Sequence, residues 1–119
     1  MNLQDILEHF RLLSGQSEEE AAPWVRLCSR YMRVLRSRLR DPALEEKNAA
    51  LLSAAAAEMA YAKYVELSAA REAESFSAGD ITVRSFGEGA LRAAKSVAED
   101  AEVSVRHLLA DQEFLFRKC

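Results

Sequence analysis

The hydrophobic positions near the start of the chain recur at steps of three and four residues. Over Asn2–Leu13 they are Leu3, Ile6, Leu7, Phe10 and Leu13. This spacing places them on one side of a helix, and Ser14-Gly15 supplies a stop signal after it. The pattern therefore predicts a short first helix over Asn2–Leu13.

A second amphipathic segment follows, and two signals mark its start. Ser17 is followed three residues later by Glu20, which is a capping-box pattern. Pro23 then falls inside the expected helix. The helix therefore begins either just before Pro23 or with this proline in its first turn, where the amide needs no partner. The apolar stripe over Trp24–Arg40 predicts that the helix continues to the Asp-Pro pair that follows.

Two long alanine-rich helices are predicted in the second part of the chain, over Pro42–Glu74 and Glu88–Phe116. Eleven residues between Ala49 and Ala73 are alanine, which has the highest helix propensity and lets neighbouring helices approach closely. The last helix carries a heptad-like apolar seam. Its members are Leu91, Ala94, Ala98, Ala101, Val105, Leu108, Gln112 and Leu115. The apolar run Phe114–Phe116 is expected to dock back on the core or to contact a neighbouring molecule.

The segment Ser75–Phe86 interrupts the helical pattern between the two long helices. Ile81-Thr82-Val83 is a β-prone run, and Ala78-Gly79-Asp80 before it is a turn signal. So short a strand must pair with its own upstream arm as a hairpin or with another chain. We therefore expect residues 75–86 to form a projecting β-hairpin or extended loop. The candidate residues for contact with another subunit are Phe76, Gly79, Asp80, Ile81, Thr82 and Val83.

Composition is consistent with a single helical domain over residues 1–119. Half of the 119 residues are hydrophobic, and the net charge of −3 gives no global attraction to nucleic acid or to an anionic membrane. The two cysteines, Cys28 and Cys119, do not form a secreted-protein framework, so a reducing compartment is expected. The predicted fold class is mainly α, with about four helices (two short, two long) and the small β-element.

Catalytic chemistry has no visible basis in the sequence. His9 and His107 lack a positioned partner, no cysteine and histidine spacing resembles a zinc site, and Gly87-Glu88-Gly89 is too short for a phosphate loop. We therefore expect no enzyme activity, no cofactor, no metal and no small-molecule substrate. The chain start lacks signal-peptide features, and the longest apolar run, Ala49–Ala57, is too short to span a bilayer. A protein that is neither secreted nor inserted in a membrane is expected.

A cluster of arginines is the most distinctive charged feature of the sequence. Six of them and no acid lie between Trp24 and Arg40. The candidate contact residues for an acidic surface or DNA are Arg26, Arg30, Arg33, Arg36 and Arg40. Helical spacing lets most of them share one face, with Arg36 close to it. Three interpretations stay open: a solvated or internally paired face, docking onto an acidic protein surface, or contact with a phosphate backbone.

Three segments carry a resemblance to a known family. They read Ala-Tyr-Ala-Lys-Tyr at 60–64, Ser-Phe-Ser-Ala-Gly-Asp-Ile-Thr-Val at 75–83 and Leu-Leu-Ala-Asp-Gln-Glu-Phe-Leu-Phe at 108–116. Together they resemble the head–tail connector, or head-completion, proteins of tailed bacteriophages and prophages. The resemblance covers roughly Asp41 to Phe116, and the segment 76–83 is its most distinctive part.

The resemblance implies a small helical subunit that assembles as a ring below the capsid portal. The ring would extend the DNA channel and dock tail-completion proteins. The implied partners are therefore other copies of the chain, the portal, tail-completion proteins and DNA passing through the channel, with no membrane. The implied location is the virion or the host bacterial cytoplasm. The segment Ser77–Arg84 would contact a neighbouring subunit or the portal.

Two other functions compete with this hypothesis. The first is a nucleic-acid-binding regulator that uses the arginine-rich helix 24–40, for which salt-dependent DNA binding is the expected sign. The second is a helical-bundle interaction protein whose β-element closes as its own hairpin, for which a monomer or simple dimer is expected.

Overall fold

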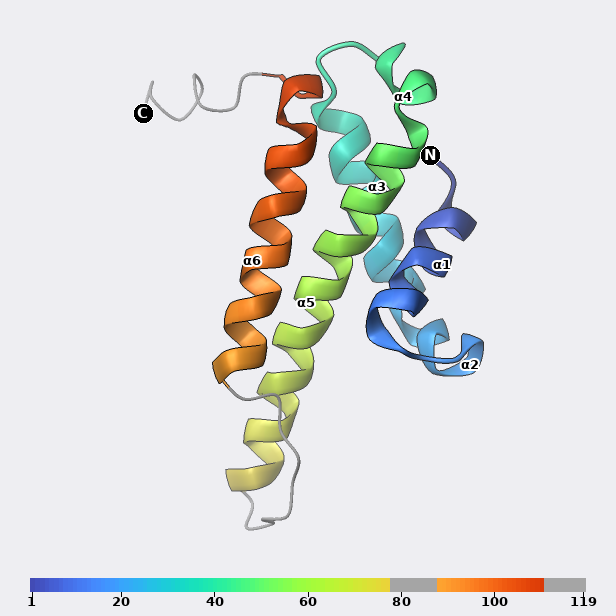
Figure 1. Ribbon diagram of the computed structural model, residues 1–119. Coiled ribbons are helices and arrows are strands. Elements are labelled where there is room, and N and C mark those ends of the chain that lie inside the picture. Colours follow the sequence, from blue (N-terminus) through green and yellow to red (C-terminus); the bar gives the residue numbers. More distant parts are fainter. Residues whose placement is uncertain (78–87, 111–119) are drawn as a thin grey trace.

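The computed structural model describes residues 1–77 and 88–110 (Figure 1). The four long helices are α1 (Leu3–Ser14), α3 (Val25–Arg38), α5 (Ala49–Ser77) and α6 (Glu88–Val105). The short elements are α2 (Glu18–Ala21), the 3-10 turn η1 (Ala22–Trp24), α4 (Leu44–Lys47) and the 3-10 turn η2 (Arg106–Leu108). The predicted mainly α class with about four principal helices is confirmed.

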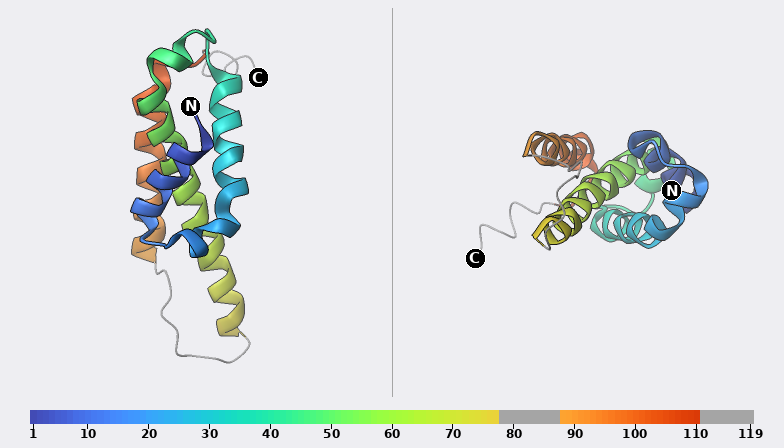
Figure 2. Two further views of the ribbon diagram at one scale, coloured as in Figure 1. Left: turned by 90° about the vertical axis from the view of Figure 1, so that its right-hand side faces the viewer. Right: turned by 90° about the horizontal axis from the view of Figure 1, so that it is seen from below.

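Helix α5 is the central element of the molecule. It packs against α1, α3 and α6, and α1 also packs against α3. Seen along its length, α5 lies between α6 on one side and the N-terminal helices on the other (Figure 2). Helix α4 lies at one end of the molecule, and α5 ends and α6 begins at the opposite end (Figure 1).

Local capping fixes the first helices where the sequence indicates. The Asn2 side chain accepts a hydrogen bond of 2.9 Å from the Asp5 amide at the start of α1. Gly15 ends α1 with a φ of 71°, a left-handed conformation that costs glycine little. The Ser17 hydroxyl accepts from the Glu20 amide at 3.1 Å, and the Glu20 carboxylate accepts from the Ser17 amide at 2.9 Å. This confirms the predicted capping box.

Pro23 divides the second amphipathic segment. The capping box begins only the short α2, which Pro23 and its neighbours follow as the 3-10 turn η1, and the α-helix proper starts at Val25. Proline fits the start of η1 because its missing amide has no intrahelical partner there. The sequence predicted one helix with two alternative starting points. The structure instead has three consecutive elements, α2, η1 and α3.

The structure divides the predicted helix from about Pro42 to Glu74 into α4 and α5, and both of its ends shift by two or three residues. The Asp41 carboxylate accepts from the Ala43 amide at 3.0 Å and holds a turn, so the first helical residue is Leu44. Asn48 then separates α4 from α5, and its side chain donates to the Leu44 carbonyl at 3.0 Å.

At its other end α5 continues to Ser77, past the predicted boundary. Ser75, Phe76 and Ser77 are therefore helical, which corrects the predicted start of the β-element. Strong helix propensity in the preceding alanine-rich segment favours this continuation. The rest of the predicted contact segment, Gly79–Val83, lies outside the described residues.

The predicted helix to Phe116 is also too long. Helix α6 ends at Val105, η2 follows, and Leu109 forms an antiparallel bridge with Leu39. The Arg40 amide donates to the Leu108 carbonyl at 3.0 Å, and the Ala110 amide donates to the Arg38 carbonyl at 2.8 Å. These long-range bonds replace helical ones and allow both Leu108 and Leu109 to be buried. The seam positions 112 and 115 lie outside the described residues.

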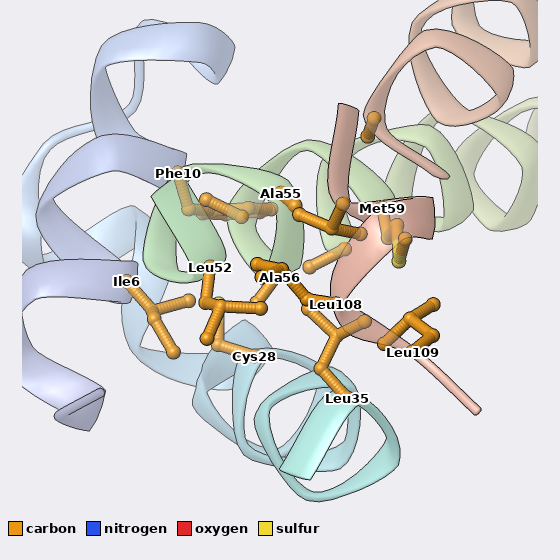
Figure 3. Packing of buried hydrophobic residues seen from close by; sticks show 14 of the residues in the cluster. Ile6, Phe10, Cys28, Leu35, Leu52, Ala55, Ala56, Met59, Leu108 and Leu109 are labelled. Carbon is orange, nitrogen blue, oxygen red and sulfur yellow. The ribbon is translucent and has the colours of Figure 1, made fainter. Parts of the chain in front are cut away.

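The hydrophobic core gathers around α5, where the other helices pack against it (Figure 3). Its members include Ile6, Phe10, Cys28, Leu35, Leu52, Ala55, Ala56, Met59, Leu108 and Leu109. The Tyr64 ring makes edge-on contacts with Phe10 and Trp24, at centroid distances of 5.6 and 4.8 Å. Cys28 is fully buried, and burial raises the pKa of its thiol to about 11. It therefore serves as a small hydrophobic residue.

Leucine-to-alanine substitutions at two sites test this core. Leu35 is fully buried, and Leu12 on α1 exposes 83% of its surface. We expect Leu35→Ala to lower the free energy of unfolding by about 2–5 kcal/mol, because it removes buried methyl groups and leaves a cavity. The matched control Leu12→Ala should change it by less than about 0.5 kcal/mol. Urea unfolding followed by circular dichroism measures both values, and equal losses would contradict this core assignment.

Candidate interaction site

The predicted arginine face divides into two groups in the structure. Arg26, Arg30 and Arg33 lie exposed on the outward side of α3, at spacings of four and three residues. Arg36 and Arg40, which were predicted to share this face or lie close to it, instead bond to other elements of the same chain. Their contact with an acidic surface or DNA stays a prediction.

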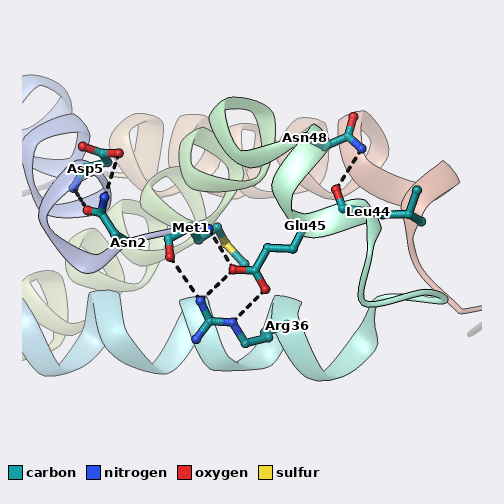
Figure 4. A network of polar contacts seen from close by, with 7 residues as sticks. All are labelled: Met1, Asn2, Asp5, Arg36, Leu44, Glu45 and Asn48. Carbon is teal, nitrogen blue, oxygen red and sulfur yellow. Dashed lines mark hydrogen bonds and ion pairs between the residues drawn. The ribbon is translucent and has the colours of Figure 1, made fainter.

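Arg36 is held by an ion-pair network that joins the chain start, α3 and α4 (Figure 4). Its Nε donates to Glu45 Oε1 at 2.9 Å and its terminal nitrogen to Glu45 Oε2 at 2.7 Å. The same nitrogen donates to the Met1 carbonyl at 3.1 Å, and the Met1 amino group donates to Glu45 Oε2 at 2.8 Å. Hydrogen bonds from Arg36 and Met1 lower the Glu45 pKa from 4.5 to about 2. Glu45 thus remains ionised and ties three segments together.

Arg40 and Arg38 bind the region where α3 and α6 end. Arg40 Nε donates to the His107 carbonyl at 3.0 Å. The Arg38 guanidinium lies 3.7 Å from the Glu102 carboxylate. Arg40 cannot share the helical face of Arg26 because α3 ends at Arg38 and the chain is extended at the next residue. The local pattern did not predict these uses, since each partner is distant in sequence.

The remaining arginines form a compact outward row, defined here as Arg26, Arg30 and Arg33. Arg30 lies over the ring of Tyr31, with 5.6 Å between the guanidinium carbon and the ring centroid. Within residues 1–77 and 88–110, neither Arg26 nor Arg33 has a hydrogen-bond, ion-pair or ring partner. This arginine row presents positive charge that an acidic protein surface or a phosphate backbone can accept.

An open groove of about 610 Å³ lies between α3 and α6, over α5. Apolar side chains from all three helices line much of it, among them Tyr31, Val34, Met59, Ala62, Leu91, Ala94 and Ala98. Charged side chains of both signs also line it, including Arg38, Lys63, Glu66, Lys95, Glu99 and Glu102. The sequence analysis missed this groove. The available signal was the alanines at 62, 94 and 98, which leave space between helices that larger residues would fill.

The other predicted contact residues lie at or after the end of α5 in the sequence. Phe76 belongs to the last turn of α5, while Gly79, Asp80, Ile81, Thr82 and Val83 lie outside the described residues. In the part of the chain that the structure describes, no group of three or more histidine, cysteine, aspartate or glutamate side chains could hold a metal ion. None of the described helices is both long and apolar enough to cross a membrane.

Comparison with known proteins finds no match: no protein-family model, no curated protein and no solved structure resembles this chain to a significant degree.

The Arg36–Glu45 network predicts a pH-dependent contribution to stability. The lowered pKa of Glu45 means that its stabilisation is present above about pH 4.5 and lost as the pH falls toward 2. The side chains of Arg36 and Glu45 are 44% and 21% exposed, so solvent screening reduces the effect. We expect Glu45→Gln to cost about 1 kcal/mol at pH 7 and progressively less below pH 4.5.

Urea unfolding at pH 7, 4 and 3 measures this dependence. Glu46→Gln is the matched control, because Glu46 is the exposed next residue on the same short helix. A Glu45→Gln penalty that stayed constant over this pH range would rule out the proposed linkage.

Proposed function

We propose that this chain is a non-catalytic structural subunit of a bacteriophage or prophage head–tail connector. In this proposal, copies of the chain assemble as a ring below the portal, extend the DNA channel and dock tail-completion proteins. The proposed location is the virion or the host bacterial cytoplasm. The sequence resemblance over roughly Asp41–Phe116 suggests this function, and the shape of the helical body supports it.

The observation that carries the proposal is the extension of α5 beyond the rest of the body. Its 29 residues give a length of about 43 Å at 1.5 Å per residue. Among the α5 side chains that the structure describes, none after Val65 is buried, and Leu67 is 40% exposed. The last turns of α5 therefore reach one end of the molecule, beyond its core (Figure 1). An element that extends beyond its own core is suited to contact another subunit.

The proposed mechanism is assembly through repeated contacts. A patch on one subunit that binds a different patch on the next generates a closed ring when the rotation between subunits permits it. Main-chain hydrogen bonds from Ile81–Val83 would supply affinity in such a contact, while neighbouring side chains would supply selectivity. The arginine row would face an acidic surface of the portal or DNA in the channel.

The nucleic-acid-binding regulator is retained as a second candidate, because the arginine row favours it. Arg26 and Arg33 have no partner among the described residues, so both are available to phosphates. The net charge of −3 opposes strong non-specific binding to nucleic acid, so this candidate depends on the arginine row alone. A helical-bundle interaction protein with a self-contained hairpin is the third candidate.

Solution mass tests the assembly proposal. We expect the wild type to form an oligomer larger than a dimer as its concentration rises. Ile81→Pro/Val83→Pro should remain monomeric with unchanged helical circular dichroism, because proline removes main-chain donors needed for strand pairing. The control Ile81→Ala/Val83→Ala keeps these donors and should retain the oligomer. A wild type that is monomeric at every concentration would contradict self-assembly and favour the third candidate.

Duplex DNA binding tests whether the arginine row contacts phosphates, as the second candidate requires. If the arginine row contacts phosphates, Arg26→Glu/Arg33→Glu should weaken binding and reduce the dependence of log K on log salt by about two. Lys47→Glu/Arg106→Glu is the charge-matched control, because both residues are exposed and lie away from the row. We expect the wild type to bind duplex DNA weakly, with no difference between the two variants. A loss confined to the Arg26/Arg33 variant would establish the nucleic-acid interface.

A further inference from the structure

The groove between α3 and α6 begins where the described part of the chain ends. Leu39 and Leu109 form an antiparallel bridge, and the Ala110 amide donates to the Arg38 carbonyl. The described chain therefore ends beside the last residue of α3, and that residue, Arg38, itself lines the groove.

Arg38 has an unsatisfied hydrogen-bond donor at this end of the groove. Its Nε is buried and has no partner among the described residues. Its contact with Glu102 is long, at 3.7 Å, and uses a different nitrogen. A buried donor without an acceptor costs free energy. Asp111, the residue after Ala110, brings a carboxylate to this position along the chain.

The residues that follow match the groove in chemistry and in reach. They read Asp-Gln-Glu-Phe-Leu-Phe-Arg-Lys-Cys over 111–119, so acids precede an apolar triplet. The groove volume of about 610 Å³ lies within the range of about 300–1,000 Å³ that holds drug-sized apolar groups. Along α6, the distance from Glu102 to Leu91 is about 16 Å at 1.5 Å per residue. Five residues of extended chain beyond Ala110 cover about the same distance.

We propose that the segment 111–119 of the same chain occupies the groove between α3 and α6. The Asp111 carboxylate accepts from Arg38, and the side chains of Phe114, Leu115 and Phe116 cover the apolar lining that includes Val34 and Met59. This occupancy would close the groove and would compete with any partner that binds there. It goes beyond the proposed function and does not depend on it.

Disulfide trapping tests the proposal in the full chain. Arg117→Cys, in a Cys119→Ser background, is combined with either Leu91→Cys or Val103→Cys. Leu91 lines the groove, whereas Val103 on the same helix does not, and both are partly exposed apolar residues (36% and 56%). Cys28 remains in place because it is buried and its raised pKa keeps the thiol protonated. Mild oxidation at low protein concentration is followed by peptide mass mapping.

If the segment occupies the groove, the yield of intrachain disulfide should be several-fold higher with Leu91→Cys than with Val103→Cys. Adding Phe114→Asp/Phe116→Asp should remove this preference, because the apolar triplet can no longer occupy the groove. Equal trapping at both positions, or none at either, would overturn the proposal. A disulfide that forms only between two copies would also overturn it, and would assign the groove to a neighbouring molecule.

Discussion

The fold depends on the close approach of three helices to α5. Ala55, Ala56, Ala57 and Ala60 are each at most 1% exposed, and their small side chains let helix axes come near the lower end of the usual 8–10 Å. Between Leu52 and Val65, buried residues lie around much of the circumference of α5, as in a central helix and unlike a surface one. Larger residues at these alanines would separate α1, α3 and α6 from one another.

The same small residues explain the groove. Helices α3 and α6 both pack on α5, and they meet each other at their C-terminal ends through the Leu39–Leu109 bridge and the Arg38–Glu102 pair. Farther from this junction, alanines do not fill the space between the two helices. The alanines that allow close packing around α5 therefore also leave an apolar groove where only α3 and α6 flank it.

The sequence predicted the helix ends that are set by residues close together in the chain. Gly15 and the Ser17–Glu20 capping box act within one helical turn, so residue spacing reveals them. The end of α6 escaped prediction because it depends on backbone bonds to residues 38–40, about 70 positions earlier. Heptad spacing continues through Leu108 and on to Leu115, and it carries no information about these competing bonds. The boundary at Asn48 was missed for a local reason, since strong alanine propensity on one side masked a turn held by Asp41 and Asn48.

The use of the arginines follows from the same distinction between local and distant partners. Spacing alone places Arg36 near the outward face of α3, but Glu45 follows a turn that the spacing does not describe, and Met1 lies 35 residues earlier in the chain. The arginines of α3 that hold the fold already have acceptors, which leaves Arg26, Arg30 and Arg33 as the arginines of this helix available to a partner. Arg30 lies over Tyr31, and Tyr31 in turn lines the groove. The arginine row and the groove are therefore linked through one cation–π contact on α3, so a ligand seated at Tyr31 would alter the surroundings of Arg30.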